Sequence, residues 1–467
     1  MSRTRGRRGF ASGAAAVTAA TLLLAACTPG SGGNGDEETT EPAPGDDATT
    51  TGEIVTDIST LEDQTLVVWD QEVRGGQAEQ IEQLNADFMA EYPNITIERT
   101  SVSNDDLTTT LGLALSGSDA PDVTQVNNSR SQMGRYVAAG QLLNLDPYAE
   151  AYGWTDRFSD SVLQNTRYSE DGVTFGEGAI FGLPQVGEVV GIFYSKSKLD
   201  ELGLELPETW AAFGDQLAEI SDGGETPLML GNLDQWPSGH VFGQIQGAHV
   251  DPEEIRALGF GNAGASWESP ENQAAAEELG SWVDAGYFNE GFNGADYDAI
   301  WQAFSEGEGV YLMAGSWLGA DIEATMGEDV GFIAPPPVEA GAGKVTTGGT
   351  GIPFAVTSQA SNPDVAAAYI DFITSAEAMT VLAETGNMPV VETTENMPED
   401  GLQADIYQAY AEVTEDGSLV PYLDWSTPTM GDTLGQSLQS FMGGQLDAAG
   451  LLAALEADYG DFVASNN

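Results

Sequence analysis

Short apolar segments alternate with amphipathic segments along most of this chain, and the alternation limits the folds that the chain can adopt. TLVVW has the composition of a buried strand, and residues 77–92 carry Ile81, Leu84 and Phe88 at helical spacing. ITIER and PDVTQV read as two further strands, with a helical DDLTTTLGLAL between them. A β-α-β-α-β run predicts an open parallel sheet that is flanked by helices.

A second set of strands and helices follows in the later part of the chain. GIFYSK, PLMLG and VYLMA have strand character, residues 210–220 form a predicted helix, and GIPFAVT returns to strand. Residues 61–467 are long enough for two domains, so we predict two α/β lobes with a helical end. The helices predicted at that end span residues 364–373, 402–413, 434–441 and 448–462.

The chain opens with a secretory signal. Arginines precede an apolar run over residues 14–26, which is too short to span a bilayer, and the run leads to Cys27, the only cysteine. LAAC, ending at Cys27, resembles the bacterial lipobox, in which the signal is cut before the cysteine and the cysteine is acylated. We predict a lipoprotein signal over residues 1–26, with a plain secretory signal as the alternative. The pair Arg7-Arg8 leaves Sec and twin-arginine export open.

Residues 27–60 carry the lipidated cysteine and then Gly, Ser, Thr, Pro and acidic residues, a composition that cannot fill a core. We predict a disordered tether there. No later run is long and apolar enough to span a bilayer. The membrane is therefore expected to be a partner through the N-terminal lipid only.

The chain is strongly acidic, with a formal charge of −60. Cleavage after residue 26 removes four arginines and no acidic residue, which leaves ten basic and 74 acidic side chains and a charge of −64. Nucleic acid and anionic lipid would repel such a chain, so neither is an expected partner. Adaptation to high salt is one explanation of the charge, and the sequence leaves it open.

Motifs for catalysis and cofactors are weak. GFGNAG at residues 259–264 matches a dinucleotide fingerprint, but a predicted helix precedes it where a strand is required. Ser195 and Lys198 match S-x-x-K without its partner motifs. Only His240 and His249 represent histidine, so we expect no metal, no cofactor and no Cys-His catalysis. A glycosidase needs only two carboxylates, and so many acids make any such pair uninformative.

Aromatic residues at strand ends point to sugar binding. Trp236, Trp317 and Trp425 stand near the ends of strand-like segments beside Gly, Pro, Asn or Asp. In open α/β sheets ligands bind beyond the carboxyl ends of the strands. The C–H face of a sugar packs on an indole, while its hydroxyls need polar side chains. Packed core is the more frequent role for any one tryptophan and stays the alternative for each of these, and Trp301 is assigned to core.

Ordered segments carry a family resemblance over residues 62–464. They are FMAEYPNITIE, LSGSDAPDV, GQLLNLDPY, IFGLPQVGEVVGIFYSKSKLDELGLELPETWAAF, AFSEGEGVYLMAGSW, GFIAPPP and NPDVAAAYIDFITSAEAMTVLAETGNMPV. Together, behind a lipobox, they resemble the family 1 extracellular solute-binding proteins of carbohydrate ABC importers, which include the maltose-binding protein.

The resemblance implies a two-lobed α/β fold of the type II periplasmic-binding-protein kind, with a ligand cleft between the lobes. Lobe I would comprise residues 61–187 and 331–373, and lobe II would comprise residues 188–330 and 374–467. Such proteins are monomers without catalytic residues. They close on a hinge around a sugar and deliver it to the permease subunits of an ABC importer.

The resemblance also implies site residues. Glu188 matches the acid after GLP, Trp317 matches the stacking tryptophan after GS, and Trp236 falls in the GNLDQWP loop. Val126 stands where the maltose-binding protein has a tryptophan, which puts maltose itself in doubt. The complete set of implied ligand contacts is Gln71, Asn127, Asn128, Arg130, Glu188, Asp234, Trp236, Trp317, Gly349 and Trp425.

We therefore predict an exported protein, lipid-anchored to the outer face of the cell membrane, that binds a monosaccharide or oligosaccharide for an ABC importer. Two alternatives stay open, a secreted glycan hydrolase and a sugar-sensing surface co-receptor. The identity and chain length of the sugar also stay open.

Overall fold

The computed structural model describes residues 54–466. The predicted signal, Cys27 and most of the predicted tether lie outside the described residues. The last residues assigned to the tether belong to the folded body instead. Ile58 lies in the 3-10 helix η1 (Ile58–Thr60) and is fully buried. The backbone N–H of Val55 donates to the carboxylate of Asp364 at 3.0 Å.

The first sheet has the strand order β11-β3-β1-β2. Strand β1 pairs in parallel with both β2 and β3, as the β-α-β-α-β pattern predicts, while β11 adds an antiparallel edge from far along the chain. The bounds of these strands are β1 (Gln64–Asp70), β2 (Ile95–Ser101), β3 (Val123–Gln125) and β11 (Phe354–Val356).

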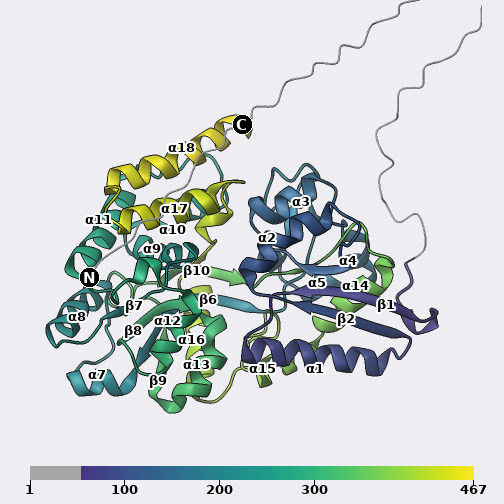
Figure 1. Ribbon diagram of the computed structural model, residues 1–467, viewed down its shortest axis with the longest axis horizontal. Coiled ribbons are helices and arrows are strands. Elements are labelled where there is room, and N and C mark those ends of the chain that lie inside the picture. The colour runs from purple at the N-terminus through teal and green to yellow at the C-terminus, as the bar shows by residue number, and fades with distance from the viewer. Residues whose placement is uncertain (1–53, 467) are drawn as a thin grey trace, which may run out of the picture. The chain divides into compact units, whose positions relative to one another are not determined.

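Helix α1 (Gly75–Glu91) covers one side of this sheet (Figure 1). Its predicted apolar face is confirmed, because Ile81, Leu84 and Phe88 are buried in one core with Leu66 and Val68 of β1. Other helices of this part of the chain are α2 (Asn104–Leu115), η2 (Arg130–Gly134), α3 (Arg135–Ala138), α4 (Asp146–Tyr152), α5 (Trp154–Arg157), α6 (Asp160–Gln164), α14 (Pro363–Ile373) and α15 (Ala376–Glu384).

The second sheet has the order β12-β10-β6-β8-β7, with β9 also paired to β6. It mixes parallel and antiparallel pairs. Strand β6 is antiparallel to β8, β9 and β10, whereas β7 is parallel to β8 and β12 is parallel to β10. The bounds are β6 (Gly187–Ser195), β7 (Leu228–Met229), β8 (Tyr311–Gly315), β9 (Val330–Ile333), β10 (Val345–Thr350) and β12 (Ser418–Val420). A separate hairpin joins β4 (Arg167–Tyr168) to β5 (Ala179–Ile180).

Helices pack around the second sheet and bury two further apolar cores. The buried Trp301 confirms the expectation that this residue is core. The helices are α7 (Lys196–Leu202), α8 (Trp210–Asp222), α9 (Trp236–His249), α10 (Pro252–Gly259), α11 (Pro270–Ala285), η3 (Phe292–Gly294), α12 (Tyr297–Ser305), η4 (Ser316–Leu318), α13 (Gly319–Met326), η5 (Gly327–Asp329), α16 (Gly401–Glu415), η6 (Leu423–Trp425), α17 (Met430–Met442) and α18 (Ala448–Asn466).

The second and third passages of the chain between the sheets come later in the structure than the sequence predicts. The sequence predicts residues 331–350 in lobe I, whereas β9 and β10 both pair with β6 of the second sheet. Residues 376–384 were assigned to lobe II, yet Met379 and Leu382 of α15 are buried in the core of the first sheet. Strand pairing and helix packing between distant segments decide both points, and local composition does not encode them.

Strands β6 and β10 run between the two halves of the described chain (Figure 1). Gly348 pairs with Val189, and Gly349 pairs with Glu188. A Cβ on Gly348 would lie 2.5 Å from the carbonyl oxygen of Glu188, so only glycine permits this close approach.

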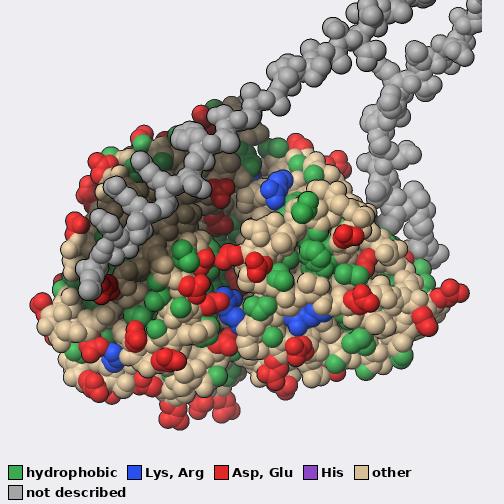
Figure 2. Space-filling model, in the orientation of Figure 1, with side chains coloured by type: hydrophobic (Ala, Val, Ile, Leu, Met, Phe, Trp, Pro, Cys, Tyr) green, Lys and Arg blue, Asp and Glu red, His purple; other side chains and the backbone are tan. Residues whose placement is uncertain are grey.

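Acidic side chains are spread over the face that Figure 2 draws, with few lysines and arginines among them. Between residues 54 and 466 no single helix is long and apolar enough to cross a membrane. The bent pair α14 and α15 passes that test only when the two helices are taken together.

Candidate functional site

A cavity of about 490 Å³ lies between segments of the two sheets, and its lining brings together most of the predicted site residues. Strand ends and the loops after them supply the lining, as expected for an open α/β sheet. The predicted residues that line it are Gln71, Asn127, Asn128, Glu188, Asp234, Trp236, Trp317 and Trp425.

Arg130 and Gly349 are the predicted site residues that do not line the cavity. The guanidinium of Arg130 is buried and donates to the carbonyl oxygens of Val173, Phe260 and Ser426. Gly349 lies within β10, and its neighbours Thr347 and Thr350 face the cavity in its place.

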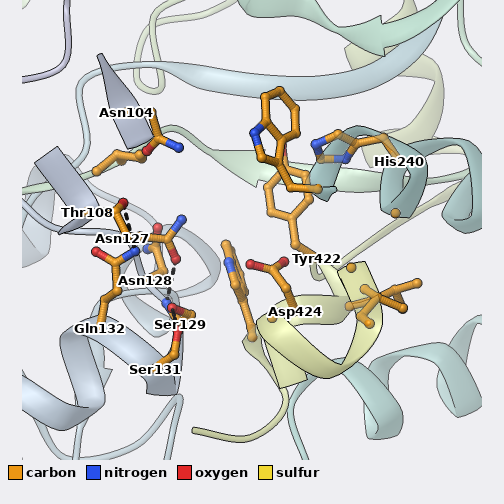
Figure 3. Close-up of a pocket in the computed structure, with 18 of the residues that line it drawn as sticks. Asn104, Thr108, Asn127, Asn128, Ser129, Ser131, Gln132, His240, Tyr422 and Asp424 are labelled. Carbon is orange, nitrogen blue, oxygen red and sulfur yellow. Dashed lines mark hydrogen bonds between the residues drawn. The ribbon is translucent and has the colours of Figure 1, made fainter. Parts of the chain in front are cut away.

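Five aromatic side chains form one wall of the cavity, which we call the aromatic wall: Trp236, Trp317, His240, Tyr422 and Trp425. The rings follow one another, with centroid distances of 6.4 Å from Trp236 to Trp317, 5.4 Å from Trp317 to His240, 5.4 Å from His240 to Tyr422 and 5.2 Å from Tyr422 to Trp425. His240 and Tyr422 lie on the same side of the cavity in Figure 3. Such a surface offers several apolar faces to a ring-shaped ligand.

The backbone around Trp317 fixes the direction of its indole. Strand β8 ends at Gly315, and η4 begins at the next residue. A Cβ on Gly315 would lie 1.9 Å from the indole ring, so glycine is required for the ring to lie where it does. The indole N–H donates to the hydroxyl of Tyr297 at 3.0 Å. The ring face is thereby held, with its only polar atom satisfied away from the ligand.

Trp236 begins α9 after a strained turn. Gln235 has a φ of 69°, a conformation that side chains other than glycine rarely adopt. Its amide donates to the side-chain oxygen of Gln439 at 2.9 Å, which holds the turn. His240 follows Trp236 by four residues, so both side chains fall on one face of α9.

Amides and hydroxyls form the wall opposite, which we call the polar wall (Figure 3). The side-chain amide of Gln132 donates to the hydroxyl of Thr108 at 3.2 Å, and Asn127 accepts the backbone N–H of Ser129 at 2.9 Å. Side chains of this kind both donate and accept hydrogen bonds, as sugar hydroxyls do. The members are Asn104, Thr108, Asn127, Asn128, Ser129, Ser131 and Gln132.

The acid Glu188 contributes to the cavity from the start of β6. Burial raises the pKa of Glu188 to about 8, against a hydrogen bond from Tyr422 that lowers it. Burial also raises the pKa of Glu72 to about 7, although Gln125 donates to it at 2.6 Å. Glu72 and Glu188 line a space of about 10 Å³, large enough for one water, that shares lining residues with the main cavity.

The charged side chains that line the cavity are mostly acidic. Burial raises the pKa of Asp424 to about 6, and burial lowers the pKa of His240 to about 4, so the imidazole is neutral at pH 7. The guanidinium of Arg74 lines the cavity but is paired with Asp298 at 3.0 Å. Arg135 also lines the cavity; its guanidinium donates to the hydroxyl of Tyr136 at 2.9 Å, and no carboxylate forms an ion pair with it among the described residues. A ligand therefore meets carboxylates, amides, a neutral imidazole and the guanidinium of Arg135.

Several lining residues were not predicted. Tyr422 and Asp424 lie in YLDW beside Trp425, so a wider reading of that segment would have included them. His240 could have been found from its spacing to Trp236 on one helix. Asn104 and Thr108 come from the polar face of α2, which looks like an ordinary solvated face in sequence.

No group of three or more His, Cys, Asp or Glu side chains within residues 54–466 is arranged to hold a metal ion. The GFGNAG string begins at Gly259, the last residue of α10, and continues in the loop after it, as the preceding helical pattern predicted.

Known proteins resemble this chain in both sequence and structure. The multiple sugar-binding protein of Streptococcus mutans serotype c is 24% identical over 316 residues, which are 65% of this chain and 70% of that protein. A solved chitin oligosaccharide binding protein matches with a TM-score of 0.74 and 22% identity, over 86% of this chain and 99% of the other. UgpB from Mycobacterium tuberculosis, in complex with glycerophosphocholine, matches with a TM-score of 0.70 and 17% identity, over 87% of this chain and 100% of the other.

These structural matches confirm the predicted fold class, the two-lobed type II fold of periplasmic binding proteins. The sequence profile of the bacterial extracellular solute-binding proteins matches residues 74–380. That match covers more than half of the chain, and the chain belongs to the bacterial extracellular solute-binding protein family.

Proposed function

We propose that this protein is the substrate-binding component of an ABC importer and that its ligand is an oligosaccharide. The observation that carries the proposal is the pair of facing surfaces, the aromatic wall and the polar wall, across one cavity. An aromatic face packs on the C–H groups of a sugar ring, and the amides and hydroxyls opposite pair with the hydroxyls at its edge.

The size and position of the cavity support the same ligand class. About 490 Å³ is within the range of small-molecule sites. The lining comes from segments of both sheets, so a ligand there would contact both lobes and favour the closed arrangement over an open one.

The relatives add support. The streptococcal relative is named for several sugars and a structural neighbour for a chitin oligosaccharide. The neighbour that holds glycerophosphocholine makes glycerol phosphodiesters the competing ligand class. Arg135 lines the cavity without an ion pair among the described residues, so glycerol phosphodiesters belong in the test panel beside the sugars.

We also propose that the protein binds its ligand without chemical conversion, since the family consists of binding proteins. On this proposal Glu188 accepts hydrogen bonds from the ligand and is no catalytic acid. A secreted hydrolase remains the alternative, and release of reducing ends from oligosaccharides by the purified protein would support it.

Export and anchoring complete the proposal. The signal over residues 1–26 directs export, Cys27 carries the lipid, and the body acts as a monomer on the outer face of the membrane, where it meets the permease. For the lobe boundaries we propose residues 54–187 with 351–391 as lobe I and the remainder of the body as lobe II, because the strand pairing and helix packing support these crossing points.

The test is a thermal-shift panel followed by calorimetry on the mature protein with Cys27→Ser. The panel contains monosaccharides, oligosaccharides of increasing length, polyols and glycerol phosphodiesters. A bound ligand raises the unfolding midpoint by mass action. Saturable binding of an oligosaccharide supports the proposal, whereas binding of a glycerol phosphodiester and of no sugar would overturn it.

A further inference from the structure

Arg130 joins the two halves of the protein through backbone carbonyls. It comes from η2 beside the first sheet, is 4% exposed, and donates through Nη1 to the carbonyl oxygens of Phe260 at 2.7 Å and Ser426 at 2.6 Å. Its Nε donates to the carbonyl oxygen of Val173 at 3.0 Å. No carboxylate forms an ion pair with Arg130 among the described residues.

That arrangement is unusual in so acidic a chain. A buried guanidinium without a carboxylate keeps its desolvation cost, and the carbonyl groups offset it only while they stay in place. Phe260 caps the end of α10, and Ser426 caps the end of η6, where carbonyl groups lack helical partners. The cation therefore ties two helix ends of lobe II to lobe I.

An aromatic contact reinforces the tie. Phe175 lies on the hairpin between β4 and β5 and stacks on Tyr168 with a centroid distance of 4.7 Å. The same ring meets Phe260 at 5.4 Å and Trp425 at 5.6 Å. Trp425 also lines the ligand cavity, so Phe175 supports a ligand-facing ring from behind.

Gly261 is the residue that allows Arg130 and Ser426 to approach each other closely. Its φ is +66°, and a Cβ there would lie 2.2 Å from the carbonyl oxygen of Ser426 and 2.9 Å from Nη1 of Arg130. Gly261, the second glycine of the GFGNAG string, thus leaves room for the side chain of Arg130. This close approach accounts for the glycine without a dinucleotide site.

We infer that Arg130 and Phe175, with Phe260 and Ser426, form an interlobe clasp that positions Trp425 in the cavity wall and keeps the lobes together before a ligand binds. Its effect on ligand affinity rests on the proposed function, whereas its effect on the ligand-free protein does not. Arg130 is a positioning residue, since it does not line the cavity.

The experiment compares wild type, Arg130→Met, Phe175→Leu and the control Arg256→Met by small-angle X-ray scattering without ligand. The side chain of Arg256 forms its ion pair with the exposed Glu253 on the same helix, so this variant repeats the chemical change without removing a side-chain contact of the clasp. We expect a larger radius of gyration for the two clasp variants and no change for the control. Unchanged radii in both clasp variants would overturn the inference.

A second measurement uses the oligosaccharide that the panel identifies. We expect about tenfold weaker binding by both clasp variants, because the closed, competent fraction falls by that factor. Saturating ligand should return their radius of gyration to the wild-type value. A merely structural defect would lower the unfolding midpoint without this reversal, and that result would count against the clasp.

The outcomes separate the two proposals. If no sugar binds even the wild type, the proposed ligand fails while the ligand-free scattering still decides on the clasp. If Arg130→Met does not fold, Phe175→Leu provides the same comparison, because it keeps the cation and its carbonyl partners and removes only the ring contacts of Phe175. A Phe175→Leu radius equal to that of wild type would then contradict the inference.

Discussion

The hydroxyl of Tyr422 donates a hydrogen bond to a carboxyl oxygen of Glu188, with an oxygen–oxygen distance of 3.2 Å. Tyr422 precedes η6 and belongs to the aromatic wall, whereas Glu188 lies at the start of the crossing strand β6. The bond therefore joins the ligand-facing rings to the segment that connects the lobes. It also places a poorly solvated acid at the centre of the site.

Stability should fall as pH rises through the range in which Glu188 loses its proton. Its pKa is raised from 4.5 to about 8, so between these values the folded protein keeps a proton that the unfolded chain has lost. Unfolding then releases a proton, and the free energy of unfolding decreases with pH. Urea titrations at pH 6.5 and pH 8.5 measure it. Glu188→Gln should flatten this dependence and leave the contribution of Glu72, whose pKa is about 7.

The difference between the two slopes isolates Glu188. Ordinary carboxylates are ionised by pH 6.5. Folded His240, with a pKa lowered to about 4, is neutral throughout the window. The unfolded imidazole still binds part of a proton at pH 6.5, which makes stability rise with pH, but this contribution is common to wild type and Glu188→Gln. Glu208→Gln, on the exposed surface, is the matched control and should keep the wild-type slope. An equal slope for Glu188→Gln and wild type would show that Glu188 is ionised throughout.

Loss of the Trp317 indole should weaken ligand binding. We expect Trp317→Ala to lower the affinity for the identified sugar at least tenfold, roughly 1.4 kcal/mol, by calorimetry. Gly315→Ala should weaken it too, because the added Cβ would lie 1.9 Å from the indole and displace it. The control is Trp282→Phe, which alters a buried tryptophan in a core beside the second sheet and should bind the sugar normally. Normal binding by Trp317→Ala would remove this residue from the site.

Arg99 should be far more important to stability than a surface cation. It holds the fully buried Asp70 through two bonds of 2.6 and 2.7 Å. Arg99→Met leaves that carboxylate uncompensated, at a cost of about 3–5 kcal/mol in the free energy of unfolding. Lys198→Met, which breaks a more exposed pair with Glu225, should cost at most about 1 kcal/mol.

Denaturant titration measures the free energy of unfolding of each variant, and a double variant checks the explanation for Arg99→Met. Adding Asp70→Asn to Arg99→Met removes the buried charge and should recover part of the loss. A double variant less stable than Arg99→Met alone would show that the carboxylate is stabilising without its partner.

Replacement of Cys27 tests the anchor. Cys27→Ser removes the lipid attachment point, so the protein should appear in the medium and bind sugar with unchanged affinity. Cell fractionation with immunodetection measures the distribution, and Ser31→Ala, in the same segment, serves as a control that stays with the membrane. Continued membrane retention of Cys27→Ser would contradict a lipoprotein signal.

Much of the fold could be predicted because apolar periodicity reports which face of an element is buried. The pattern at Ile81, Leu84 and Phe88 indicated α1 and its packing, and TLVVW indicated β1. The cavity residues at strand ends could be predicted as well, because parallel strands bring their carboxyl ends together at one edge of the sheet.

Other features depend on contacts that sequence order hides. The three carbonyl partners of Arg130 lie 43, 130 and 296 residues away, so no local pattern could separate a clasp from a ligand contact. The crossing points depend on contacts such as the pairing of β10 with β6 across a separation of more than 150 residues, which local sequence does not encode. Acids were uninformative in sequence, and only burial distinguishes Glu188 from the exposed carboxylates.

The aromatic wall gives the protein a built-in optical reporter. Trp236, Trp317 and Trp425 line the cavity, whereas the other six of the nine tryptophans do not. Trp236 and Trp317 are partly exposed, whereas Trp425 is only 2% exposed. A sugar that excludes water from the cavity should therefore shift chiefly the emission of Trp236 and Trp317 against the constant signal of the other indoles. Selective replacement of each indole by phenylalanine would resolve that signal ring by ring, and unlabelled protein could then follow ligand entry in real time.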